Sequence, residues 1–219
     1  MLSQENTTHI IKNAVILPLF YHHDPITCIA ISKALYAGGI RAIEFTNRGE
    51  KALANFKILV EERNKTMPDL LLCVGTITNT TDAQLFIEAG ADVLISPVFD
   101  ADISDIAYMH KILWIPGCMT PTEIHTAYSA GWSLLKLFPG NVLQPHYVQA
   151  IKPLFPKIDF LITGGVEANT ENIMEWRKSG AVGVGLGSKL ITSSLINNGN
   201  MHELTETVAR LVQFFSNHN

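Results

Sequence analysis

Cysteine and long hydrophobic runs are scarce in this 219-residue sequence. The three cysteines, Cys28, Cys73 and Cys118, stand far apart, without a Cys-x-x-Cys pair or the dense set of a secreted disulfide scaffold. They predict buried thiols in a reducing cytoplasm. No run approaches the roughly 18 apolar residues that cross a membrane, and residues 1–13 lack the basic and apolar regions of a secretory signal. We therefore expect neither export nor a membrane span.

The charged residues argue against a second group of functions. Lys and Arg number 16 against 20 Asp and Glu, the formal net charge is −4, and the basic residues are dispersed, so nothing indicates a nucleic-acid partner. The eight histidines form neither an HxxxH nor an HExxH pattern, and the adjacent His22 and His23 point to opposite sides of an extended segment. We expect small-molecule chemistry without a metal ion.

The rest of the composition is typical of one globular domain. Hydrophobic residues make up 47% and charged residues 16%, and no linker or low-complexity segment interrupts the chain. Short β-rich apolar runs start roughly every 20 to 29 residues, and each is followed by a helix-compatible stretch. The eight runs are residues 14–20, 42–47, 70–76, 93–97, 113–117, 134–139, 159–165 and 182–188.

Helix boundaries alternate with these runs. The start signals are Asp24-Pro25, Thr80-Thr81-Asp82 and Pro121-Thr122-Glu123, and Ala-Gly pairs at 37–38, 89–90 and 130–131 end helices. Apolar strands joined by helices form a parallel sheet, and eight such units close it into a barrel. We predict an α/β fold, a single-domain TIM (β/α)8 barrel over residues 1–219 with a short N-terminal helix. The rival is a doubly wound open sheet, but Gly-Val-Gly-Leu-Gly at 183–187 follows the last run and lacks GxGxxG spacing.

Such a barrel carries its chemistry at the C-terminal ends of its strands, and there Lys136 is the most informative residue. It lies in Leu134-Leu135-Lys136-Leu137-Phe138-Pro139 without an acidic neighbour in sequence. Apolar surroundings disfavour the ammonium form and leave an amine that attacks carbonyl carbons, which is Schiff-base chemistry. Alternatively, the lysine reaches water from the strand end or pairs with Glu44 across the barrel.

Glu44 lies in an equally apolar run, residues 42–46. Burial favours the protonated form of a carboxyl, which suits it to proton transfer during imine formation and carbon–carbon cleavage. Its alternative role is that of a counter-ion to Lys136 or Arg48. The two roles are compatible with each other.

Arg48 and Thr76 suit the recognition of a carboxylate. The first offers a bidentate fork, and the second offers a hydroxyl at a strand end that follows a glycine. Together they predict a keto-acid ligand. The alternative for Arg48 is a solvated pair with Glu50.

Small residues follow the last two predicted strands, at Gly164-Gly165 and Gly187-Ser188. At these places many barrels bind phosphate through backbone N–H groups and the start of a short helix. A phosphorylated ligand is therefore predicted. The alternative is that the glycines only form tight turns between strand and helix.

In chain order, these motifs resemble those of the bifunctional 2-dehydro-3-deoxy-phosphogluconate / 4-hydroxy-2-oxoglutarate aldolases, over nearly the whole chain. The motifs are Glu44-Phe-Thr-Asn-Arg48, Val74-Gly75-Thr76, Ile95-Ser96-Pro97, Ile115-Pro116-Gly117, Leu135-Lys136-Leu137-Phe138-Pro139, Thr163-Gly164-Gly165 and Gly187-Ser188. The resemblance implies Lys136 as the Schiff-base residue and Glu44 as the acid/base. It implies substrate contacts at Arg48, Thr76, Pro97 and Phe138, and phosphate contacts at Gly164, Gly165, Gly187 and Ser188. It further implies a cytoplasmic homotrimer without a cofactor.

Three departures from the family pattern concern the distal end of the substrate. Val98 stands where members often have Gly, and Gly49 follows Arg48 where a hydroxyl residue is common. Residues 140–147 are more similar to the phosphogalactonate-cleaving relatives, whereas Arg48 is typical of the phosphogluconate type.

Three functions follow, of which the first is preferred. It is class I cleavage of 2-dehydro-3-deoxy-6-phosphogluconate to pyruvate and glyceraldehyde 3-phosphate, or of 4-hydroxy-2-oxoglutarate to pyruvate and glyoxylate, with the phosphogalactonate isomer as an alternative substrate. The second is a phosphate-binding isomerase or synthase in which Lys136 is an electrostatic clamp. The third is a non-catalytic sugar-phosphate binding barrel.

Overall fold

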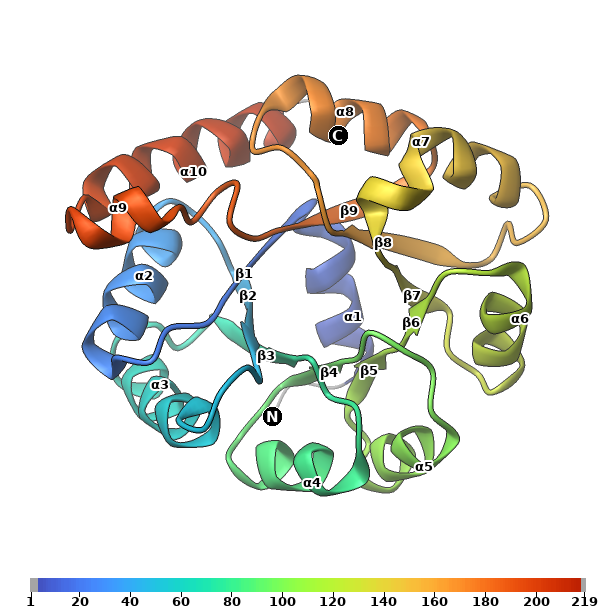
Figure 1. Ribbon diagram of the computed structural model, residues 1–219, viewed down its shortest axis with the longest axis horizontal. Coiled ribbons are helices and arrows are strands. Elements are labelled where there is room, and N and C mark those ends of the chain that lie inside the picture. The colour runs from blue at the N-terminus through green and yellow to red at the C-terminus, as the bar shows by residue number, and fades with distance from the viewer. Residues whose placement is uncertain (1–3, 218–219) are drawn as a thin grey trace.

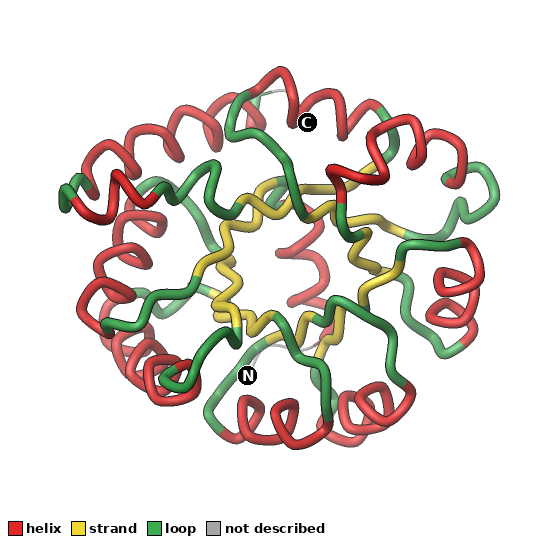
Figure 2. Tube along the Cα trace, in the orientation of Figure 1, coloured by secondary structure: helices red, strands yellow, loops and turns green. Residues whose placement is uncertain are grey.

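The computed structural model describes residues 4–217, which form a ring of parallel strands surrounded by helices (Figures 1 and 2). The predicted α/β barrel is confirmed. The predicted domain of residues 1–219 extends past both ends of the described range, so its outermost residues lie outside the described residues and its boundaries stay a prediction.

The strands recur along the chain at the same intervals as the apolar runs of the sequence. They are β1 (Ile16–Phe20), β2 (Ala42–Thr46), β3 (Leu71–Gly75), β4 (Val93–Ile95), β5 (Leu113–Ile115), β6 (Gly117–Cys118), β7 (Leu134–Leu137), β8 (Asp159–Thr163) and β9 (Ala181–Leu186). The helices are α1 (Gln4–Asn13), α2 (Pro25–Ala37), α3 (Ala52–Thr66), α4 (Thr80–Glu88), α5 (Ala101–His110), α6 (Pro121–Ser129), α7 (Gly140–Ile151), α8 (Thr170–Lys178), α9 (Ser193–Asn197) and α10 (Met201–Ser216).

The fifth predicted strand, residues 113–117, is divided in two, which corrects its expected continuity. Its first part, β5, pairs with β4, and its second part, β6, pairs with β7. Pro116 separates them because proline has no N–H to donate to a ladder. The Pro116 carbonyl still accepts a hydrogen bond from the Lys136 amide at 2.9 Å. The ring therefore closes through this residue, although the strand order runs from β5 through β1 to β6.

Two apolar layers hold the barrel together. The larger layer lies between strands and helices and includes Phe45, Phe56 and Trp114. The smaller layer fills the inside of the barrel with Leu17, Ala42, Leu71, Cys73, Val93, Ile95, Leu113, Ile115, Leu134 and Leu161. Ile11 of α1 belongs to this inner layer, and Figure 1 shows α1 across the opening of the ring. The barrel interior is thus packed and closed by α1.

The predicted helix signals operate as expected, with one shift. Asp24 caps α2 by accepting from the Thr27 amide at 2.8 Å, and Thr120 and Glu123 form a reciprocal capping box on α6. After α2 the left-handed conformation falls on Gly39 rather than on Gly38. The local signals therefore place helix boundaries to within one residue.

The three cysteines are buried and free, which confirms the prediction of buried thiols. Burial raises the pKa of Cys28 to about 11 and that of Cys118 to about 12. Among the helices of residues 4–217, none is long and apolar enough to cross a membrane.

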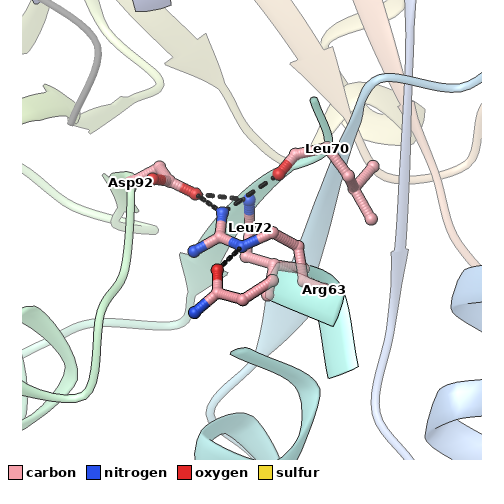
Figure 3. A network of polar contacts seen from close by, with 5 residues as sticks. Arg63, Leu70, Leu72 and Asp92 are labelled. Atoms are coloured by element: carbon pink, nitrogen blue, oxygen red, sulfur yellow. Dashed lines mark hydrogen bonds and ion pairs between the residues drawn. The ribbon is translucent and has the colours of Figure 1, made fainter. Parts of the chain in front are cut away.

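A polar network joins α3 to the start of β3 and the residue before β4 (Figure 3). The Arg63 guanidinium donates to the Leu70 carbonyl at 3.0 Å and to the Asp92 carboxylate at 2.6 Å. Asp92 also accepts from the Leu72 amide at 2.9 Å. The side chains of Arg63 and Asp92 are only 12% and 17% exposed, so water screens this pair weakly.

Replacing Asp92 by Ala should lower the free energy of unfolding by about 2 to 4 kcal/mol, because it leaves a largely buried guanidinium without its carboxylate partner and the Leu72 amide without its acceptor. Denaturation in urea measures the loss. Lys33→Ala is the control, since the Lys33–Glu62 pair is more exposed and its removal should change stability by about 0.5 kcal/mol or less. Equal losses in the two variants would contradict a special contribution of the network.

Candidate active site

Lys136 and Glu44 meet inside the barrel. All four residues of β7 are buried, and alternation along the strand directs Lys136 inward, on the same face as Leu134 of the inner apolar layer. Glu44 likewise lies on the inner face of β2, two residues after Ala42 of the inner apolar layer. The Lys136 Nζ donates to Glu44 Oε1 at 3.4 Å, with residue exposures of only 5% and 1%. The predicted acid and amine are therefore brought together, away from bulk water.

The other oxygen of Glu44, Oε2, is buried and has no hydrogen-bond partner among the described residues. Buried carboxylate oxygens are normally paired, so this atom is available to a donor that enters the barrel. Gly75 of β3 packs directly against the carboxylate, because a Cβ at that position would overlap Oε1. The absence of a side chain at position 75 is thus what admits Glu44 to its place.

The next residue, Thr76, has φ of 64°, which is an unusual conformation for a β-branched residue. It is half-buried and directly follows the glycine that contacts Glu44. Pro97 follows β4 and lies close to β6. Its backbone packs against Gly117, which is aligned in register with Lys136. Both predicted residues therefore lie next to the strands that carry the pair.

A cavity of about 440 Å³ opens at the C-terminal ends of the strands, within the size range of small-molecule sites. It brings together six predicted residues, which are Arg48, Phe138, Gly164, Gly165, Gly187 and Ser188. Thr76, Pro97, Glu44 and Lys136 do not line it. Phe138 connects the two regions, since the Lys136 Nζ lies 5.6 Å from the centre of its ring.

Arg48 is exposed, and no hydrogen bond or ion pair involves its guanidinium within residues 4–217. The alternative pairing with Glu50 is accordingly not formed. The guanidinium remains available to an anion in the cavity.

The glycines of the predicted phosphate site differ in what the fold requires of them. Gly165 has φ of 72°, and a Cβ there would overlap Asn141 in the first turn of α7. For Gly165, this supports the alternative that the glycine is required by the turn between strand and helix and by its packing. Gly187 has room, because the nearest atom to an added Cβ is 3.4 Å away on Leu19. Ser188 is exposed at the cavity.

Thr163 is a candidate residue to which the sequence motifs assigned no role. It lines the cavity, and its buried hydroxyl has no partner in the described part of the chain. Leu161 is aligned with Lys136, so Thr163, two residues further along β8, lies on the same face one layer nearer the mouth. Its hydroxyl at the C-terminal end of a predicted strand is the signal in the sequence that could have drawn attention to it.

The described residues contain no group of three His, Cys, Asp or Glu side chains that could hold a metal ion. That no metal or cofactor takes part stays a prediction.

Comparison with known proteins agrees with this geometry. A family model described as "KDPG and KHG aldolase", for 2-dehydro-3-deoxy-phosphogluconate and 4-hydroxy-2-oxoglutarate aldolase, matches residues 7–207. The chain belongs to this family. The 2-dehydro-3-deoxy-phosphogluconate aldolase of Pseudoalteromonas atlantica is 30% identical over 93% of this chain and 92% of its own length. The crystal structure of the KDPG aldolase from Legionella pneumophila, with pyruvate captured as a covalent carbinolamine, has a TM-score of 0.83 at 26% identity and covers 92% of this chain and 95% of its own.

Membership in the KDPG and KHG aldolase family makes the chain a carbon–carbon lyase. The alternatives of an isomerase and of a non-catalytic binding barrel are therefore not supported. The 2-dehydro-3-deoxy-6-phosphogalactonate aldolase of Escherichia coli is 32% identical, but over only 55% of this chain and 58% of its own length. The phosphogalactonate alternative is thus less favoured than the phosphogluconate one.

Proposed function

We propose that this chain is a class I aldolase that cleaves 2-dehydro-3-deoxy-6-phosphogluconate to pyruvate and glyceraldehyde 3-phosphate, and 4-hydroxy-2-oxoglutarate to pyruvate and glyoxylate. The observation that carries the proposal is the buried Lys136–Glu44 pair with one unpartnered carboxylate oxygen. An ion pair with a purely structural role has its remaining polar atoms satisfied, since burying them costs free energy. The covalent carbinolamine that the Legionella relative forms with pyruvate supports the same chemistry.

The reaction begins when the uncharged Lys136 amine attacks the keto carbon. The resulting carbinolamine loses water, with Glu44 supplying the proton, and leaves a protonated imine. Glu44 then removes the proton of the C4 hydroxyl, the C3–C4 bond breaks, and its electrons move into the imine to form an enamine while the aldehyde departs. Glu44 returns a proton to C3. Water hydrolyses the imine to release pyruvate and the free lysine.

Recognition of the substrate is assigned to residues at the mouth. Arg48 and Thr76 bind the carboxylate of the pyruvyl part, the first by its free guanidinium and the second by its hydroxyl. Pro97 and Phe138 pack against the carbon chain. Thr163 donates to a substrate oxygen, because its hydroxyl is otherwise unpaired inside the barrel.

The phosphate of the longer substrate is assigned to the backbone N–H groups near Gly164, Gly165 and Gly187 and to the Ser188 hydroxyl, which share one cavity with Arg48. The homotrimer and the cytoplasmic location implied by the family resemblance stay predictions.

Borohydride in the presence of pyruvate should leave a reduced, covalently attached pyruvyl group on Lys136, because borohydride reduces an imine but not an ammonium paired with a carboxylate. Mass spectrometry of peptides locates the group. Lys152, whose amine is also near a carboxylate, is the internal control and should stay unmodified. Labelling elsewhere, or none at saturating pyruvate, would contradict the proposal.

Gly75→Ala should displace the Glu44 carboxylate and lower the turnover number by about 10²-fold, within the usual contribution of a positioned acid/base. Glu44→Gln is the reference variant and should lose at least as much while still binding pyruvate. Release of pyruvate is followed with lactate dehydrogenase. Near-normal turnover in both variants would reduce Glu44 to a counter-ion.

Ser188→Asp places a carboxylate beside the proposed phosphate position. It should lower kcat/KM for the phosphorylated substrate by about 100-fold through charge repulsion, with a change of about threefold or less for 4-hydroxy-2-oxoglutarate. Ser188→Ala is the uncharged control. Position 188 is preferable to 165 because substitution of Gly165 disturbs packing against Asn141. Equal losses on both substrates would count against a phosphate site there.

A further inference from the structure

A hydrogen bond between two side chains links the connections that follow β2 and β3. Asn47 Nδ2, directly after β2, donates to Asp82 Oδ2 in the first turn of α4 at 3.1 Å. Asn79 Nδ2 donates to the same oxygen at 2.8 Å. Asp82 is thus the shared acceptor of two connections that start from neighbouring strands.

The linked connections carry the two proposed carboxylate ligands. Asn47 immediately precedes Arg48, and its amide donates to the Gly75 carbonyl at 2.8 Å, one residue before Thr76. Residues 48 to 50 are exposed, so the Arg48 side chain is not held by packing. Within the described residues, the Arg48 guanidinium makes no hydrogen bond of its own. The side-chain bond of Asn47 to Asp82 is therefore the nearest side-chain contact that fixes the backbone before Arg48.

We propose that the Asn47–Asp82 hydrogen bond is a positioning contact, which holds the connections of Arg48 and Thr76 at the separation that one substrate carboxylate requires. The inference rests on the proposed function. A long side chain such as Arg48 binds best when its backbone is held in place, because less conformational freedom is then lost on binding. Neither Asn47 nor Asp82 touches the substrate in this arrangement.

A purely local role for Asp82 is separable from this one. Asn79 caps α4 through its Oδ1, which accepts from the Asp82 amide at 2.8 Å, and this bond does not involve Asn47. Loss of the Asn47 side chain therefore removes the side-chain link between the two connections, and it leaves in place the helix cap and the bond from the Asn47 amide to the Gly75 carbonyl. Asn79→Ser provides a matched control, since it removes a donor to Asp82 but keeps a capping hydroxyl.

The experiment measures how the rate of borohydride trapping on Lys136 depends on ligand concentration, for pyruvate and for methyl pyruvate, which lacks the carboxylate. Asn47→Ala should raise the half-saturating concentration of pyruvate about tenfold, because the less firmly held connections of Arg48 and Thr76 then lose more conformational freedom on binding. The value for methyl pyruvate and the thermal midpoint of unfolding should stay near those of the wild type. Asn79→Ser should change the pyruvate value by about twofold or less, because the link between connections is intact.

An exchanged pair tests the contact directly. Asn47→Asp alone opposes two carboxylates and should weaken pyruvate binding further, whereas the double variant N47D/D82N restores a donor and an acceptor in reversed order and should recover most of the affinity. The proposal is overturned if Asn47→Ala leaves pyruvate binding unchanged, if both ligands weaken equally, or if the folded double variant fails to recover. Absence of trapping in the wild type is a different result, which overturns the proposed function and this inference with it.

Discussion

The buried pair of Lys136 and Glu44 is the constraint to which the rest of the barrel is fitted. Two ionisable groups inside a protein lose hydration, so they persist only where geometry and function offset that cost. Below them the inner apolar layer and Ile11 of α1 close the barrel. Beside them Gly75 leaves the space that the carboxylate occupies.

Chemistry and recognition are consequently separated by depth. The groups proposed to exchange protons lie inside the barrel on strands, where packing holds them, and the groups proposed to recognise anions lie at the mouth on connections. Phe138 and Thr163 lie between the two regions. This division allows members of one family to keep the same reaction while the connections change the distal part of the substrate.

Much of this organisation was predictable from the sequence because it depends on local patterns. Apolar runs at regular spacing identified the strands, and the residue types at their ends identified Lys136, Glu44 and Arg48 as candidates. The division of the fifth strand at Pro116 was missed, although the missing N–H of proline was visible in the sequence. Thr163 was missed as well, because its importance depends on having no partner, which the sequence does not reveal.

The sequence by itself determined the barrel, the helix boundaries and the kinds of side chain available for the reaction, since each is set by residues close together in the chain. Only the tertiary structure decided which of them meet. Lys136 and Glu44 are 92 residues apart, and Asn47 and Asp82 are 35 apart, so both contacts depend on closing the sheet in one register. The same closure gives the glycines different tasks, because Gly75 accommodates a carboxylate whereas Gly165 accommodates Asn141.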